Sequence, residues 1–250
     1  MQHTRSASAQ TAAMLRFPDL TPVQEARKEA ALVFRKAAPL VAVPPARPNP
    51  SLGHVKFTVL SFLNMHAYGD LLVSFMRMRK QTFIDRLNWQ LPETAGMEYD
   101  QYDTPACRWI AVHEFGEVIG GIRISPTTAR CGIYSYMLRD AQRGLLDEIP
   151  SDVLFFDAPV SETIWEASRL FIAQSVPAHR RSQVQAVLME ALSKAARAEG
   201  ASQIIGIVPA VWSRWLRRLD LGAVPVGPKF AIDGTISQAA LFNSSWGGAT

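Results

Sequence analysis

At 250 residues, the chain is long enough for one large domain or two small ones, and its 48% of hydrophobic residues can supply a buried core. No apolar run of about 18 residues and no secretory signal are present, so we expect neither a membrane-spanning helix nor a membrane partner. Residues 85–166 carry fourteen acidic and six basic side chains, whereas residues 169–219 carry eight basic and two acidic ones. This asymmetry predicts an acidic neighbourhood for a cationic ligand and a basic face for an acidic partner, unless each run is simply a solvated face.

The first 53 residues are predicted to form a flexible, Ala- and Pro-rich N-terminal extension. The stretch from Ala37 to Ser51 contains five prolines, which remove backbone donors and disfavour regular structure. One short amphipathic helix is possible between Thr21 and Ala38, because Thr21-Pro22 supplies an N-cap with proline in the first turn. The folded domain is therefore expected to span residues 54–250.

The folded domain alternates strand and helix patterns. In chain order we predict a strand over 54–62, a helix over 64–88, a break at 92–96, a hairpin of strands 108–114 and 117–124, a short helix over 137–146, a strand over 163–173, a helix over 182–199, a strand over 204–208, a short helix over 210–219 and strands over 223–226 and 238–242. Phe115-Gly116 marks the hairpin turn, and Gly200 closes a helix. This order predicts an α/β fold in three layers, a mixed sheet flanked by helices on both faces.

The two cysteines, Cys107 and Cys131, form no Cys-x-x-Cys pair and lie near no histidine cluster. We therefore expect no metal site. Two reduced thiols and the absence of a secretory signal are typical of a cytoplasmic protein.

Two charged residues interrupt strand-like apolar runs. Glu166 follows Ile164-Trp165, and Arg123 lies between Ile122 and Ile124. A buried charge is costly without a partner. The residues alone leave open a purely structural Glu166–Arg123 pair or a site with chemistry.

The spacing of eight residues resembles the signature of the acyl-homoserine-lactone synthases of the LuxI type. The eight are Arg79, Phe83, Trp89, Asp100, Asp103, Arg123, Glu166 and Arg169, of which the first six are separated by steps of 4, 6, 11, 3 and 20 residues. The resemblance covers residues 54–250. The first 53 residues have no counterpart in the typical member, and the segment between Arg123 and Glu166 is longer than in the shorter members.

The resemblance implies a GNAT-like acyltransferase fold with a V-shaped opening between central strands. It also implies a reaction that makes a quorum-sensing signal. An acyl chain passes from acyl carrier protein or acyl-CoA to the amine of S-adenosyl-methionine, and lactonisation then releases methylthioadenosine. S-adenosyl-methionine would be a substrate, and no cofactor is implied.

That chemistry assigns expected roles to the acidic and aromatic residues. Asp100 and Asp103 would attract the cationic substrate at short range. Glu166 would remove the ammonium proton, through a water, because an amine must lose its charge before it attacks. Trp89 and Phe83 would stack on the adenine or face the sulfonium, the alternative being core packing.

The arginines of the signature are expected to play two different parts. Arg79 would donate hydrogen bonds to the substrate carboxylate. Arg123 and Arg169 would instead orient Asp100, Asp103 and Glu166.

The acyl donor is predicted from residues 176–183, where coenzyme-A-dependent relatives of this fold carry a glycine-rich phosphate loop. This stretch contains no glycine, which weakens an acetyl-coenzyme A reading but leaves acyl-CoA possible. Acyl carrier protein is acidic and would fit a basic surface. The predicted acyl-carrier surface consists of Arg180, Arg181, Lys194, Arg197 and Arg217.

The acyl chain is expected in a pocket lined from the sheet and the last two helices. Its predicted lining is Ile124, Ile207, Val208, Trp212 and Leu216. The run from Ile204 to Ala210 contains no Ser or Thr for an oxo group, which favours an unsubstituted chain.

Two other functional classes are weighed against this one. A GNAT-type N-acyltransferase using acyl-CoA on another small amine would share the fold but would not need Asp100 and Asp103. A non-enzymatic regulator would use the basic residues for nucleic acid. The sequence lacks a helix-turn-helix signature and a module of interleaved stacking aromatics, so no nucleic-acid partner is expected.

Overall fold

The computed structural model describes residues 53–210, 212, 222–232 and 234–245, all of which belong to one compact unit. The predicted extension at 1–53 therefore lies outside the described residues, except for its last residue. The possible helix between Thr21 and Ala38 and most of the predicted 210–219 helix also lie outside them. Within the described part, no helix is both long and apolar enough to cross a bilayer.

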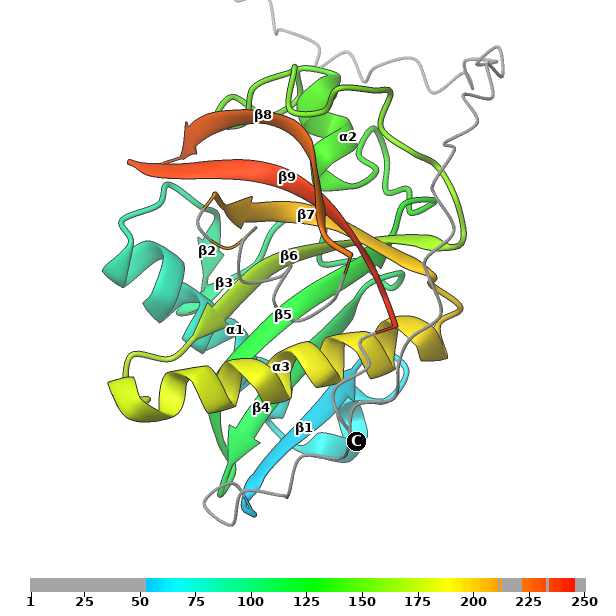
Figure 1. Ribbon diagram of the computed structural model, residues 1–250. Coiled ribbons are helices and arrows are strands. Elements are labelled where there is room, and N and C mark those ends of the chain that lie inside the picture. Colours follow the sequence, from blue (N-terminus) through cyan, green and yellow to red (C-terminus); the bar gives the residue numbers. More distant parts are fainter. Residues whose placement is uncertain (1–52, 211, 213–221, 233, 246–250) are drawn as a thin grey trace, which may run out of the picture. The chain divides into compact units, whose positions relative to one another are not determined.

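A seven-stranded mixed sheet forms the middle of the molecule (Figure 1), and its order is β1-β4-β5-β6-β7-β9-β8. The strands are β1 (Val55–Leu60), β4 (Arg108–Glu114), β5 (Glu117–Pro126), β6 (Ile164–Ile172), β7 (Gln203–Pro209), β8 (Val224–Ile232) and β9 (Thr235–Asn243). Only β6 and β7 run parallel, and every other neighbouring pair in this sheet is antiparallel. The predicted α/β class with a mixed sheet is confirmed.

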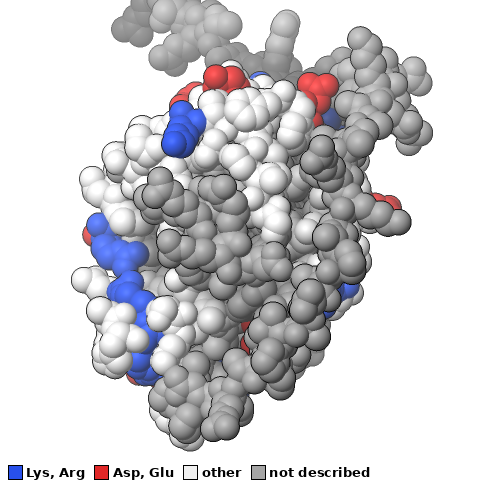
Figure 2. All heavy atoms as spheres, in the orientation of Figure 1, with Lys and Arg blue, Asp and Glu red and all other residues white. Residues whose placement is uncertain are grey.

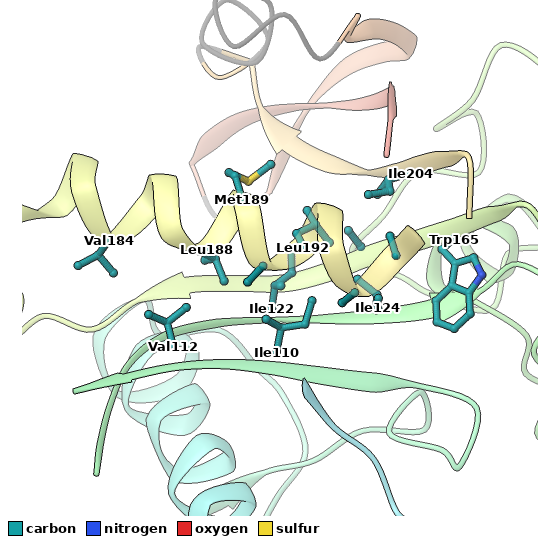
Figure 3. Packing of buried hydrophobic residues seen from close by; sticks show 14 of the residues in the cluster. Ile110, Val112, Ile122, Ile124, Trp165, Val184, Leu188, Met189, Leu192 and Ile204 are labelled. Carbon is teal, nitrogen blue, oxygen red and sulfur yellow. The ribbon is translucent and has the colours of Figure 1, made fainter. Parts of the chain in front are cut away.

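Helices cover both faces of this sheet. The helix α3 (Ala178–Ala198) lies on one face, where aliphatic side chains of β4 and β5 pack against it (Figure 3). The helices α1 (Leu71–Lys80) and α2 (Met137–Gln142) pack on the opposite face in two separate apolar clusters. Alternation along the strands explains this division, because Ile110 and Val112 face α3 whereas Trp109 and Ala111 face α1.

The β4–β5 hairpin forms as predicted. Its two-residue turn has positive φ at both positions, 50° at Phe115 and 87° at Gly116. This is the backbone of the turn that matches the twist of antiparallel strands. The hairpin aligns Arg123 opposite Trp109 in the middle of the sheet.

The helix predicted over 64–88 is instead three consecutive segments. A short 3-10 helix, η2 (Met65–Tyr68), ends at Gly69 with φ 58°, α1 follows, and a π-helical segment, η3 (Gln81–Arg86), continues directly from α1. Apolar spacing alone does not distinguish these helix types. A small hairpin of two-residue strands, β2 (Glu93–Thr94) and β3 (Met97–Glu98), begins in the predicted break at 92–96.

The parallel strands β6 and β7 pair over only part of their lengths. Their pairing ends at Ala167 and Gly206, while β6 continues to Ile172 and β7 to Pro209. A side chain at Gly206 would place its Cβ 2.5 Å from the Ala167 carbonyl oxygen, so only glycine permits this close approach. Beyond this point the two strands are no longer paired, and we refer to this unpaired stretch as the opening.

Candidate active site

Strand register brings the strand-borne charged residues to one face of the sheet. Arg123 is the register partner of Trp109 and of Ser168, and Glu166 is the partner of Ser125 and Ile205. Because side chains two positions apart share a face, Arg123 and Glu166 lie on the face that carries α1 and α2. The same face holds the turn after β3, which supplies Asp100 and Asp103.

Three arginines and three carboxylates form a buried ion-pair network on this face. Arg79 of α1 pairs with Glu98 and donates to both oxygens of Asp103, at 2.7 and 3.0 Å. Arg123 of β5 pairs with Asp100 through both terminal nitrogens, with 3.2 Å between Nη2 and Oδ2. Arg79 and Arg123 are both fully buried.

Arg169 of β6 closes the network at the edge of the opening. Its guanidinium donates to Glu98 at 3.1 Å and to Asp100 at 2.9 Å. Its side chain keeps 9% exposure, whereas those of Arg79 and Arg123 keep none. The residue has φ 55°, a left-handed conformation that is unfavourable outside glycine, and the two carboxylates hold it there.

The arginines keep Asp100 and Asp103 ionised. Burial alone would raise the pKa of Asp100, but the charges of Arg123 and Arg169 outweigh burial and lower it. Arg123 and Arg79 likewise outweigh burial and lower the pKa of Asp103. The indole Nε1 of Trp109 donates to Asp103 as well, at 2.8 Å. Three positive and three negative charges thus cancel, so Asp100 and Asp103 bring no excess negative charge to a ligand.

Glu166 has a different environment, made of backbone amides. Its two carboxylate oxygens accept hydrogen bonds from the first two amides of α2, Met137 at 2.9 Å and Leu138 at 2.8 Å. Burial raises the pKa of Glu166 to about 7, and the two amides and the Arg123 charge only partly oppose it. In the described part of the chain, Glu166 and Arg123 therefore do not form the structural ion pair that the sequence left open.

The two aromatic residues of the signature stack on each other. Phe83 and Trp89 have ring centroids 5.0 Å apart at an interplanar angle of 28°, and the Arg169 guanidinium carbon lies 5.8 Å from the Phe83 centroid. Phe83 is buried and also contacts Phe171, whereas Trp89 is only half-buried. Phe83 therefore packs in the core, and of these two rings only Trp89 keeps part of its surface exposed.

A cavity of about 300 Å³ lies beside the diverging end of β6. Its lining residues are Arg86, Leu170, Phe171, Ile172, Arg181, Gln185 and Trp212. Two of these are arginines, and neither Arg86 nor Arg181 is in an ion pair within the described part of the chain. The cavity thus combines apolar walls with two cations directly after Arg169.

A second cavity, of about 340 Å³, lies between η2, α1 and β3. Its walls are aromatic and aliphatic, with Met76, Met97 and Trp109 among them, and His66 is the only imidazole. No carboxylate or guanidinium lines it, so we assign the chemistry to the Glu166 side.

The predicted acyl-carrier surface is partly neutralised within the chain. Arg180 pairs with Glu114 at 2.9 Å and Lys194 with Glu190 at 2.6 Å, while Arg181 donates to backbone carbonyls. Arg197 is exposed, and Arg217 lies outside the described residues. Figure 2 shows Lys and Arg side chains in a column along the left edge of its view, so this face of the molecule carries a basic surface.

The predicted acyl-pocket residues are not brought together. Ile124 and Val208 pack in the cluster beneath α3, whereas Ile207 packs against the α2 cluster on the other face. Consecutive strand residues point to opposite faces, so Ile207 and Val208 cannot line one pocket. Trp212 lines the cavity beside β6, and Leu216 lies outside the described residues.

Sequence reasoning missed three contributors to the site. Glu98 binds two of the arginines, and its position next to the Asp100-Asp103 pair was the available signal. Arg86 lines the cavity beside β6, and its position on a predicted helix gave no signal of this. The backbone amides that bind Glu166 cannot be recognised from residue type, because any non-proline residue supplies a backbone N–H.

Comparison with known proteins adds an independent line of evidence. The family profile described as autoinducer synthase matches residues 65–245. An acyl-homoserine-lactone synthase of Acinetobacter nosocomialis is 31% identical over 193 residues, covering 74% of this chain and 98% of that protein. Another from Aeromonas salmonicida is 29% identical over 175 residues, 68% of this chain and 78% of that protein.

Solved structures agree with the profile. TofI, in a ternary complex with an inhibitor and MTA, has a TM-score of 0.59 and 27% identity, covering 76% of this chain and 92% of that one. BjaI, a coenzyme-A-dependent acyl-homoserine lactone synthase with SAM and isopentyl-CoA, has a TM-score of 0.62 at 23% identity and 78% and 86% coverage, and supports the fold alone. With the profile spanning most of the described chain and the signature residues gathered on one face of the sheet, the chain belongs to the autoinducer synthase family.

Proposed function

We propose that this chain transfers an acyl group from a phosphopantetheine thioester to the amine of S-adenosyl-methionine and closes the product to an acyl-homoserine lactone. The main supporting observation is Glu166, a buried carboxylate with a pKa of about 7, which two backbone amides of α2 hold on the same face of the sheet as the ion-pair network. A base that titrates near the working pH is best suited to accept a proton from an ammonium group. The similarity of the chain to two acyl-homoserine-lactone synthases supports the same reaction.

The steps balance without a cofactor. Glu166 takes a proton from the substrate ammonium, directly or through a water, and the free amine attacks the thioester carbonyl, so that an amide forms and the pantetheine thiol leaves. The substrate carboxylate then attacks the carbon bonded to the sulfonium, which breaks the C–S bond and releases methylthioadenosine. S-adenosyl-methionine is thus a substrate, consumed in each turnover.

The substrate carboxylate requires a donor with access to the opening, and Arg169 meets this requirement better than Arg79. Arg79 is fully buried and its donors are directed at Glu98, Asp103 and the Met76 sulfur. We therefore assign Arg79 and Arg123, with Asp100 and Asp103, to positioning Arg169, and Arg169 to the carboxylate.

The half-buried face of Trp89 is our candidate for the adenine or the sulfonium. An indole face attracts a cation within about 6 Å of its centroid. Phe83 supports the indole from beneath.

Arg86 and Arg181 are our candidates for the phosphate of the donor arm. Both line the cavity beside β6, whose apolar walls suit the pantetheine chain. A phosphate on this arm is common to acyl-CoA and acyl carrier protein. Docking of the carrier protein on the exposed basic surface, and a cytoplasmic location, belong to the same proposal.

Product analysis by mass spectrometry tests this function. The purified chain is incubated with S-adenosyl-methionine and matched panels of acyl-CoA and acyl-carrier-protein thioesters of increasing chain length. The proposal expects methylthioadenosine and an acyl lactone in equal amounts, and the two panels identify the donor. Acylation of another amine without methylthioadenosine would instead support a GNAT-type N-acyltransferase.

A further inference from the structure

The short helix α2 holds Glu166, and a buried carboxylate holds the beginning of α2. Asp140, one turn into the helix, is fully buried, and its Oδ2 accepts a hydrogen bond from the Ser135 amide at 2.8 Å. This bond ties the residue before the helix N-cap to the helix itself. The next two amides along the chain that point inward are those of Met137 and Leu138, which bind Glu166.

We propose that Asp140 is a positioning residue for the reaction: by closing the turn before α2, it aims the Met137 and Leu138 amides at the Glu166 carboxylate. The proposal rests on the proposed function for its catalytic meaning. Its geometric basis is that the bond from the Ser135 amide to Asp140 encloses the segment from which the Met137 and Leu138 amides donate to Glu166.

Two other residues, one at each end of α2, fix the helix to the segment before β6, so Asp140 has a separate task. The Gln142 side chain bonds the Phe156 carbonyl at 2.9 Å and the Ala158 amide at 2.7 Å. The Tyr136 hydroxyl donates to the Pro159 carbonyl at 2.6 Å. These bonds dock the helix on the segment that precedes β6, whereas Asp140 sets the turn at its start.

Asp140 also acts on Glu166 by charge. The groups that face Glu166 are Arg123 from β5, Asp140 and Tyr136 from the α2 segment, and Tyr102 from the turn after β3. Burial is the largest cause of the raised pKa of Glu166; the Arg123 charge lowers it and the Asp140 charge raises it. Arg143, half-exposed, pairs with Asp140 at 3.3 Å and partly offsets that charge.

Three substitutions at one position separate the hydrogen bond from the charge. Asp140→Asn keeps an acceptor for Ser135 and removes the charge. Asp140→Glu keeps the charge and displaces the acceptor by one methylene. Asp140→Ala removes both. Asp147→Asn, an exposed carboxylate in the following loop, is the control for the loss of one negative charge.

The readout is the pKa of Glu166 itself, followed by carbon NMR of protein labelled at the glutamate carboxyl carbon, with Glu166→Gln to assign the signal. We expect Asp140→Asn to lower this pKa below the wild-type value and Asp140→Glu to raise it, each by up to about one unit. The Glu166 pKa should be higher in Asp140→Ala than in Asp140→Asn, because of these two variants only the alanine one loses the acceptor that orients the amides. Asp147→Asn should match the wild type.

The pH at which kcat/KM for methylthioadenosine release begins to fall on the acid side should shift among the variants in the same order as the Glu166 pKa. Asp140→Asn and Asp140→Glu keep the test valid even where Asp140→Ala does not fold. The positioning role would be overturned, whatever the activity, if the Glu166 pKa in Asp140→Glu equalled the wild-type value and that in Asp140→Ala equalled the Asp140→Asn value. If the wild type released no methylthioadenosine, the proposed function would be overturned. The NMR titration would still show whether Asp140 orients the amides that bind Glu166.

Discussion

The two groups of carboxylates on the α1–α2 face differ in the groups that donate hydrogen bonds to them. Asp100 and Asp103 are bound by guanidinium groups, and charge lowers their pKa despite burial. Glu166 is bound by two uncharged amides, and burial raises its pKa to about 7. Arg123 adjoins both groups, in contact with the first and at longer range from the second.

This difference distinguishes the acidic residues that hold the structure together from the one that can transfer a proton, although all belong to the same signature. A carboxylate paired with arginine stays ionised at any physiological pH and exchanges no protons. A buried carboxylate held by amides can gain and lose a proton near neutral pH. We therefore assign the proton transfer to Glu166 and the architecture of the opening to the network.

Replacing Glu166 by glutamine should have the largest effect on turnover. Loss of a general base reduces the rate by about 10²- to 10⁴-fold, so methylthioadenosine release should fall by that factor. The folded state should lose only about 1–3 kcal/mol, because the amide NH₂ of glutamine would face one of the two backbone donors. Rate and thermal melting are measured on the same preparation, and an unfolded variant would favour a structural role.

Replacing Asp103 by asparagine should have the largest effect on stability. Removing one partner from a buried ion-pair network leaves an uncompensated charge and costs about 3–5 kcal/mol, which lowers the melting temperature by about 10 °C. Asp85→Asn is the matched control, because Asp85 pairs with Lys80 on the surface. The control should melt almost as the wild type does, and equal losses in both variants would contradict the network's role.

The pH dependence of stability should differ in sign between the two groups. The folded-state pKa of Glu166 lies above its ordinary value of 4.5, so its contribution to folding falls as pH rises from about 4.5 through 7. The lowered pKa values of Asp100 and Asp103 give a contribution that is present at neutral pH and is lost as pH falls below about 4. Melting curves from pH 5 to 8 should show that the melting temperature of the wild type falls relative to that of Glu166→Gln as the pH rises.

Replacing Arg86 and Arg181 by glutamine should have the smallest of these effects. Each arginine is expected to contribute one charge-assisted contact to a phosphate, so KM for the thioester should rise by about tenfold per residue, with kcat nearly unchanged. The rise should shrink at high salt. A KM that is unaffected in the double variant would place the donor elsewhere.

The strand framework was predictable from sequence, because hydrophobic alternation and turn residues specify it locally. The Phe115-Gly116 hairpin and the strand carrying Glu166 formed where expected. The last two strands, β8 and β9, are longer than their apolar runs, since Pro225 and Gly227 lie inside β8 where the register with β9 shifts. Breaker residues at such an irregularity concealed the full length of β8, of which only the beginning was predicted.

Site chemistry was less predictable than the framework. The spacing of the signature gathers the correct residues, but it does not say which charges cancel: Glu98 and three arginines leave Asp100 and Asp103 neutralised. The acyl-pocket prediction failed at Ile207 and Val208 because it ignored the alternation of strand faces. The donors to Glu166 are backbone groups, which sequence identity does not report.

The pH dependence of kcat/KM for methylthioadenosine release, compared between wild type and Glu166→Gln, tests the central claim most directly. A base must be deprotonated to act, so wild-type activity should rise through about pH 7, the pKa of Glu166. The variant should lose this limb and keep only the titration of the substrate's own amine, near pH 8. A limb near pH 7 that persists unchanged in Glu166→Gln would show that another group accepts the proton.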